Sequence, residues 1–249
     1  MLVIQQLVNG LMLGGVYVMV AVAFTLIIGM LNFLNFTIPA LFMFAAVLMY
    51  ATMMGQLPFG NEIILSIFGT EYRWIAGVIV ALVVVAIISL VIERFTYRYM
   101  KAKYGDATEH ALPLVSSLGF LIIFEHFVVS TWGSDPLTAV SPFGKGTFSI
   151  GTIIFSVPQI VSLFLSLIVV IMLSIMLKAT KLGRALRSIA EKPDTAILMG
   201  VEVGRIVPIV YVITGLLCAI SGVLFTINYS TVDAYVLSLI HISEPTRPY

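Results

Sequence analysis

Residues that could do chemistry are sparse in this chain of 249 residues. Its three histidines lie far apart in the sequence, and its single cysteine, Cys218, lies in an apolar run. The sequence contains no P-loop, HExxH or GxSxG motif and no His/Cys spacing typical of a metal site. It therefore predicts no catalytic residue, no metal site, no cofactor and no nucleotide hydrolysis by this chain.

The polar residues that stand out instead interrupt apolar stretches. Asn32, Asn35 and Thr37 separate two apolar runs, and polar groups at a broken helix can line a substrate path. An ordinary turn at the membrane surface is the alternative. Glu125 lies inside another apolar run, where a carboxylate indicates either contact with a translocated solute or pairing with another group. These four residues are the predicted candidates for a substrate path.

The composition places these residues in a membrane protein. Hydrophobic residues make up 60% of the chain and charged residues only 10%, whereas roughly a quarter of a soluble domain is charged. This excludes a cytosolic enzyme, a secreted domain and a disordered regulator. The formal net charge of +1 gives no basic surface for nucleic acid.

Six apolar stretches are long enough to cross a bilayer, which takes about 20 residues. They cover about residues 4–28, 38–54, 74–93, 112–132, 157–177 and 207–227. The expected fold is therefore an all-α, polytopic bundle of transmembrane helices.

Small residues at helical spacing predict where these helices pack closely. A small side chain lets two helix backbones approach where lipid supplies no hydrophobic driving force. The residues concerned are Gly10 and Gly14 in the first span, and Gly215, Ala219 and Gly222 in the sixth.

Lysine and arginine predict the orientation, because short cytoplasmic loops are enriched in them. Of the 13 basic residues, four lie in residues 93–110 and six in residues 178–206. The alternate loops hold only Arg73 and Lys145. The two basic segments are therefore predicted to be cytoplasmic, and the N-terminus external. If residues 29–37 form a break inside the membrane rather than a full turn, the N-terminus lies on the other side and the basic segments stay cytoplasmic.

The longer basic segment, residues 178–206, has a pattern of its own. Gly183 is expected to break the fifth span from a short amphipathic helix over residues 184–190. Asp194 is expected to cap a second short helix over residues 195–200. Two short helices just outside the membrane indicate a docking surface, and a loop that touches lipid headgroups is the alternative.

Several ordered blocks of this sequence resemble one family of transporters. DTAILMG at residues 194–200 resembles the EAAxxxG signature in the cytoplasmic loop of ABC importer permeases. Around it, TKLGRALRSIAEKPDTAILMGV resembles that loop in the branched-chain amino acid permease family, particularly its LivH-type subunits. The blocks QQLVNGLMLGGVYVMVAVAFTLIIGMLNFLNF, ALPLVSSLGFLIIFEHF and GVLFTINYSTVDAYV are similar to further parts of the family.

The resemblance implies a permease subunit of an ATP-driven importer in the prokaryotic inner membrane. Such a subunit moves branched-chain amino acids, or a related small polar solute such as urea or an amide, into the cytoplasm by alternating access. The implied partners are two ABC ATPase subunits, a second permease subunit, an external substrate-binding protein and the lipid bilayer. The resemblance assigns ATPase coupling to Gly183, Arg184, Arg187, Asp194, Ala196 and Gly200.

The sequence leaves two competing functions open, and it differs from the family's usual residues at two positions. An ion-coupled secondary transporter or a channel that works through Glu125 is the competing function. Thr37-Ile38-Pro39 stands where the family usually has Ala-His-Gly, and Glu125-His126 where it more often has Gln-Asn, which leaves the substrate open.

The end of the chain departs from the family as well. Residues 1–236 are predicted to be a permease domain that is incomplete, with about two spans missing at its C-terminus. Residues 237–249, LSLIHISEPTRPY, resemble translated sequencing adapter and are predicted to be a non-native tail.

Overall fold

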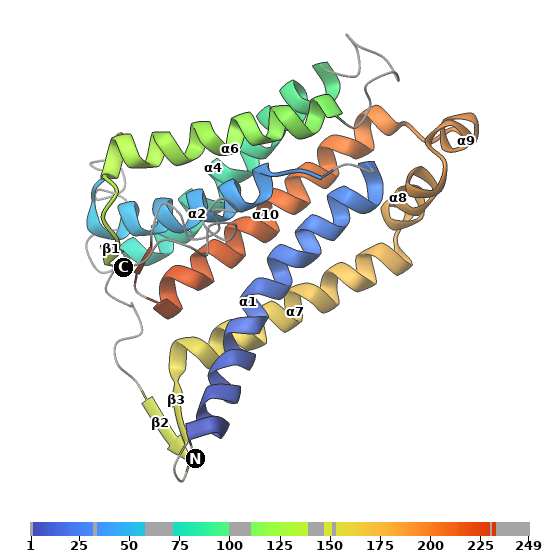
Figure 1. The fold of residues 1–249 in the computed structure, drawn as a ribbon. Coiled ribbons are helices and arrows are strands. Elements are labelled where there is room, and N and C mark those ends of the chain that lie inside the picture. Colours follow the sequence, from blue (N-terminus) through green and yellow to red (C-terminus); the bar gives the residue numbers. More distant parts are fainter. Residues whose placement is uncertain are drawn as a thin grey trace.

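Six long helices make up most of the described part of the protein in a computed structural model (Figure 1). The structure describes residues 2–31, 34–57, 72–99, 111–138, 147–150, 153–229 and 231–232. The long helices are α1 (Leu2–Leu31), α2 (Thr37–Met54), α4 (Arg73–Ile92), α6 (Ala111–Trp132), α7 (Val157–Ala179) and α10 (Val203–Tyr229). Each is long and apolar enough to cross a membrane, which confirms the six predicted spans and the helical bundle.

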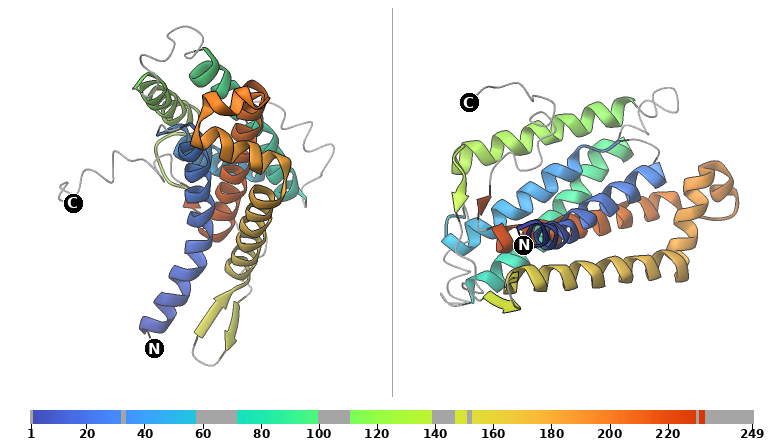
Figure 2. Two further views of the ribbon diagram at one scale, coloured as in Figure 1. Left: turned by 90° about the vertical axis from the view of Figure 1, so that its right-hand side faces the viewer. Right: turned by 60° about the horizontal axis from the view of Figure 1, so that its bottom comes forward.

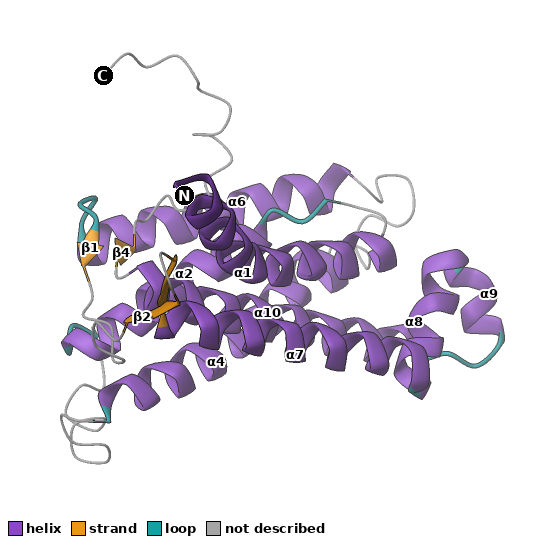
Figure 3. Ribbon diagram, turned by 90° about the horizontal axis from the view of Figure 1, so that it is seen from below, coloured by secondary structure: helices purple, strands orange, loops and turns teal. Residues whose placement is uncertain are grey.

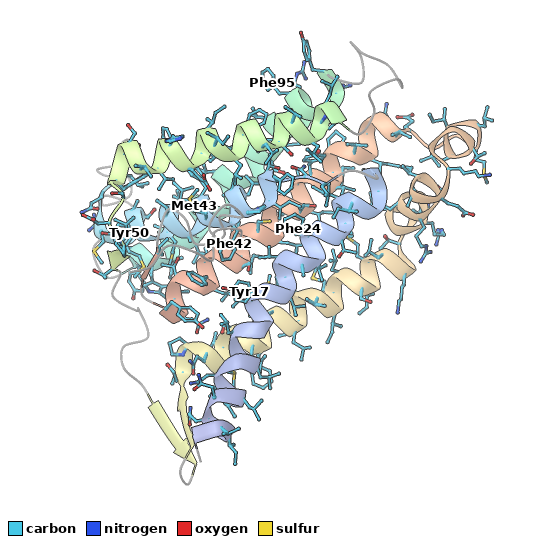
Figure 4. The ribbon with its side chains drawn as sticks, in the orientation of Figure 1. Tyr17, Phe24, Phe42, Met43, Tyr50 and Phe95 are labelled. Atoms are coloured by element: carbon cyan, nitrogen blue, oxygen red, sulfur yellow. The ribbon has the colours of Figure 1, made fainter. Side chains whose placement is uncertain are left out.

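Helix α2 forms the centre of the bundle, between α4, α6 and α10. All of its residues from Thr37 to Thr52 are buried, as expected for a helix that is apolar on every side. Phe42, labelled on α2 in Figure 4, meets the ring of Phe225 of α10 edge to face, with 5.5 Å between ring centroids. The core of the protein therefore lies along α2 and α10.

Helices α1 and α7 pack as a pair along one side of α10 (Figure 1). Their contact is close at Gly15, where an added Cβ would lie 2.6 Å from Oγ of Ser166. The outer faces of this pair carry exposed apolar side chains such as Leu7 and Met172. Such faces are expected of helices that lie against lipid.

The two ends of the bundle differ in character. One end holds the last residues of α1 and α7 together with α8 (Lys181–Glu191) and α9 (Pro193–Leu198) (Figures 1 and 3). A π-helical turn, η1 (Glu93–Arg98), continues α4 at this same end. Both basic segments thus reach one face of the bundle, which the positive-inside rule makes cytoplasmic.

The opposite end carries short strands that the sequence analysis did not predict. Strand β1 (Leu137–Thr138) pairs with β4 (Thr231–Val232), and β2 (Thr147–Ile150) pairs with β3 (Ile153–Ser156), both antiparallel. They lie outside the six spans, so the helical class of the fold is unaffected. The first pair joins the chain after α6 to the chain after α10.

Three local predictions for the cytoplasmic segment were wrong in detail. The helix break lies at Thr180, whose Oγ1 accepts a 3.1 Å hydrogen bond from the backbone N–H of Gly183 as the N-cap of α8. Asp194 does not precede the second short helix, because α9 begins at Pro193, whose fixed φ suits a first helical position. Helix α10 begins at Val203 rather than near residue 207, so Pro208 lies within it.

Candidate functional site

The α8–α9 unit, residues 181–198, projects beyond the ends of the long helices (Figures 2 and 3). Helix α8 buries Gly183, Leu186 and Ile189 and exposes Arg184 and Arg187. One apolar face on a helix with a basic opposite face is the pattern of a surface helix. The structure therefore has the amphipathic helix that the sequence indicated, three residues longer at its start.

Gly183 occupies a position where no side chain fits. A Cβ at this residue would lie 2.0 Å from the carbonyl oxygen of Leu177, an atom of the α7 backbone. Only glycine allows two backbones to approach so closely. Gly183 thus permits the sharp change of direction from α7 into α8.

Gly200 ends α9 through its backbone conformation. Its φ is +85°, in the left-handed region that favours glycine. The N–H of Gly200 donates to the carbonyl of Ile197 at 2.9 Å, and that of Val201 donates to the carbonyl of Ala196 at 3.0 Å. These bonds satisfy carbonyls at the helix end. The side chain of Ala196 is buried.

The tip of the unit is apolar and exposed. Ile197, Leu198 and Met199 have 54%, 86% and 82% of their surface exposed. These residues lie outside the six candidate membrane spans. Contiguous apolar side chains on a water-facing surface mark an interaction site. The sequence analysis missed them, although they occupy the variable positions of the EAAxxxG-like segment.

A buried polar cluster lies where α2 begins. The Oδ1 atom of Asn35 accepts hydrogen bonds from the N–H and Oγ1 of Thr37, at 3.0 and 2.6 Å. Its Nδ2 atom donates to the hydroxyl oxygen of Tyr211 at 3.3 Å. Asn35, Thr37 and Tyr211 are all almost fully buried. Asn32, the other predicted residue of this stretch, lies outside the described residues.

Two serines connect this cluster to further helices. The N–H of Phe36 donates to Oγ of Ser117 in α6 at 3.1 Å, and Ser89 of α4 donates to the carbonyl of Tyr211. Four helices, α2, α4, α6 and α10, therefore meet in one hydrogen-bonded cluster at the cytoplasmic end. Sequence reasoning did not find Ser89, Ser117 or Tyr211, since one or two polar residues in an apolar run give no signal of a partner in another helix.

Glu125 lies on the buried face of α6 that also holds Ser117, Leu121 and Val128. Only 8% of its surface is exposed, whereas His126 is exposed on a different face, so the two neighbours do not share a surface. Among the side chains that the structure describes, none forms a hydrogen bond or ion pair with Glu125. Eight residues separate Glu125 from Ser117, a rise of about 12 Å along the helix. The structure therefore places Glu125 and the Asn35 cluster on one side of α6.

The small residues of α10 contact neighbouring helices closely. A Cβ added at Gly215 would lie 2.7 Å from Cβ of Ser89. One added at Gly222 would lie 2.5 Å from the carbonyl oxygen of Phe42. Ala219, between them, is fully buried. A Cβ added at Gly10 or Gly14 of α1 would have no neighbouring atom within 4 Å. The close contact of α1 is made at Gly15 instead. A seam at Gly10 and Gly14 is thus not formed within the described chain.

Titratable groups do not gather into a chemical centre in the described part of the chain. No group of three or more His, Cys, Asp or Glu side chains there could hold a metal ion. The arrangement offers instead a surface unit at the cytoplasmic end, a polar cluster at that end of the bundle and the buried carboxylate of Glu125 within α6.

Comparison with known proteins gives consistent matches along the chain. The profile of the family described as "Branched-chain amino acid transport system / permease component" matches residues 6–242. This match passes the predicted boundary at residue 236, which stays a prediction.

Individual relatives belong to the same kind of system. The chain is 24% identical over 241 residues to the high-affinity branched-chain amino acid transport system permease protein LivH of Escherichia coli (strain K12), covering 94% of this chain and 73% of that protein. The same figures hold for LivH of Salmonella typhimurium (strain LT2). BraD of Pseudomonas aeruginosa, named as the corresponding permease protein, is 24% identical over 237 residues, covering 92% and 73%. No solved structure matches the chain.

Proposed function

The chain belongs to the family of permease components of branched-chain amino acid transport systems, and we propose that it carries branched-chain amino acids or a related small polar solute into the cytoplasm by alternating access. It is a membrane-spanning subunit of an ABC importer in the inner membrane, not an enzyme, and it works with ATPase and substrate-binding partners. The substrate follows from the names of its relatives, LivH and BraD. Two ATPase subunits and a second permease subunit complete the proposed assembly.

The exposed tip of α9 carries this proposal. Leu198 and Met199 are apolar, almost fully exposed and held outside the membrane on a short helix. An ATPase subunit that covers them would gain about 25 cal/mol for each Å² of apolar surface removed from water. Gly183, Arg184, Arg187, Asp194, Ala196 and Gly200 complete the proposed coupling segment.

Movement of this tip can reach the bundle through a short path. Only residues 199–202 separate α9 from α10, whose Tyr211 bonds to Asn35 at the start of α2. We infer that the Asn35–Tyr211 cluster holds the cytoplasmic end of the substrate path closed in this conformation. ATP binding on the partner shifts the population toward a second conformation in which these contacts are broken.

The substrate path in this proposal runs beside α2. Its residues are Asn35 and Thr37 at the cytoplasmic end and Glu125 nearer the external end, and Asn32, outside the described residues, is assigned to the path from the sequence alone. A buried carboxylate without a partner among the described side chains can bind the ammonium group of an amino acid. The chemical basis of this proposal is that the Asn35 cluster and Glu125 provide polar groups at two levels of the membrane, on one side of α6.

The test replaces the same side chain at two exposed places. Met199→Ala removes apolar surface from the tip, and Met172→Ala removes it from the lipid-facing side of α7, where the side chain is 71% exposed. We expect Met199→Ala to weaken co-purification of the ATPase subunit and to lower ATP-driven uptake of leucine. Met172→Ala should retain both.

Two results would contradict the proposal. The first is equal retention of the ATPase by both variants. The second is leucine uptake that persists when ATP is depleted but stops when the proton gradient is collapsed, since this would favour the ion-coupled transporter.

A further inference from the structure

A cavity of about 280 Å³ opens between α1, α7 and α8 at the cytoplasmic end of the bundle. Its walls are almost wholly apolar and include Val22 and Met30 of α1, Leu177 of α7 and Leu186 of α8. Gly29 also lines it and leaves open space, since no atom lies within 4 Å of a Cβ built there. An apolar cavity with so little polar lining suits a hydrocarbon chain and not a zwitterionic amino acid.

The depth of the cavity matches one leaflet of a bilayer. Val22 and Met30 lie eight residues apart on α1, a rise of about 12 Å. One leaflet, which is half of a hydrocarbon core of about 30 Å, has a similar thickness. Helix α8 crosses the inner end of the cavity at the level where the membrane helices α1 and α7 end (Figure 1). A cavity of this depth at the cytoplasmic end is long enough to span the acyl region of the inner leaflet.

The mouth of the cavity is positively charged. Arg187 lines it and is exposed, and Lys181 and Arg184 lie exposed on the same helix. Helix α1 has no charged residue, and Lys178 is the charged residue of α7. No described carboxylate pairs with Arg187, although Glu191 lies one turn further along α8. The charge that faces the headgroup level is therefore cationic.

We propose that this cavity binds an anionic phospholipid of the inner leaflet, with one acyl chain between α1 and α8 and the headgroup phosphate on Arg187. A guanidinium binds phosphate through two parallel hydrogen bonds and is well suited to this contact. The lipid fills the space beneath α8 and so supports the base of the α8–α9 unit. Within the proposed coupling segment, this site gives Arg187 a contact with lipid that Arg184, which does not line the cavity, does not make.

Native mass spectrometry of the purified full chain tests the charge contact. Delipidated protein is given equal amounts of phosphatidylglycerol and phosphatidylcholine. We expect the wild-type protein to retain one phosphatidylglycerol molecule in preference to phosphatidylcholine. Arg187→Ala should lower the retention of phosphatidylglycerol about fivefold. Arg187→Lys, which keeps the charge, should retain most of the preference. Arg184→Ala, on the same helix but outside the cavity, is the matched control and should retain it fully.

A second pair of variants tests the acyl contact. Gly29→Leu places a side chain in the open cavity and should lower retention of both lipids. Gly10→Leu makes the same change in the same helix, also where no atom lies within 4 Å, but away from the cavity, and should lower neither. Thermal unfolding of each variant shows whether it is folded.

Three outcomes would overturn the proposal. Equal retention of the two lipids by wild type would remove the charge selectivity. An equal loss in Arg184→Ala and Arg187→Ala would show a diffuse basic surface and no site. A Gly29→Cys variant that crosslinks to another protein in native membranes would show that a permease helix covers the cavity instead.

Discussion

Two glycines shape the cytoplasmic unit by different physical means. Gly183 is required because a backbone carbonyl of α7 occupies the space of its missing side chain. Gly200 is required because its φ of +85° is strained for other residues, while the space around it is open. The sequence could flag both glycines through their place in a patterned loop. It could not separate the two reasons, because the first depends on a residue six positions earlier in another helix.

Gly183→Ala should therefore destabilise the protein by roughly 1–3 kcal/mol, because the new methyl group overlaps the α7 backbone. Thermal unfolding in detergent measures this change. Gly119→Ala is the matched control, since it adds a methyl group inside α6 where no atom lies within 4 Å. A Gly183→Ala protein as stable as the Gly119→Ala protein would show that α7 and α8 meet less closely than described here.

At the scale of elements, the long helices could be predicted and their contacts could not. Hydropathy is local, so each span was found to within about four residues at either end. The polar cluster at the start of α2 joins residues from four helices, and no local pattern links Asn35 to Tyr211 across 176 positions. The apolar tip at Ile197–Met199 was missed for another reason: exposure depends on what the rest of the fold leaves uncovered.

The cluster makes a prediction about how α2 and α10 are held together. Tyr211→Phe removes the hydroxyl oxygen that accepts from Asn35 and leaves a buried amide donor unpaired. We expect a loss of about 1–3 kcal/mol in the free energy of unfolding, measured by thermal unfolding in detergent. Tyr72→Phe, at an exposed position before α4, is the control and should change little. If Tyr211→Phe were as stable as Tyr72→Phe, the hydrogen bond between Asn35 and Tyr211 would not contribute to stability.

For the whole molecule, the arrangement of helices specifies which residues face each side of the membrane. The α9 tip and the start of α4 lie at opposite ends of the bundle (Figure 1). The native cysteine, Cys218, is fully buried in α10, so labelling of introduced cysteines has little background. The chain is therefore suited to a direct test of its orientation.

A thiol reagent that does not cross membranes should label Leu198→Cys in inverted vesicles and not in intact cells. Tyr72→Cys should show the opposite pattern, because both positions are exposed but lie at opposite ends. Labelling of the two cysteines from the same side would contradict the orientation predicted from the basic segments.

The enclosure of α2 has a consequence for how the protein is made. Helix α2 contacts α1 only slightly, and most of its neighbours, α4, α6 and α10, are synthesised after it. Helix α10, which approaches the Phe42 carbonyl at Gly222, is the last of these three to be synthesised. At bacterial rates of about 5–20 residues per second, roughly 7 to 30 s pass between the end of α2 and the start of α10. During that time the surface destined for α10 faces lipid or the insertion machinery. The core around α2 is therefore completed only when a late helix docks, and α2 is the surface that an insertase or membrane chaperone has to shield until then.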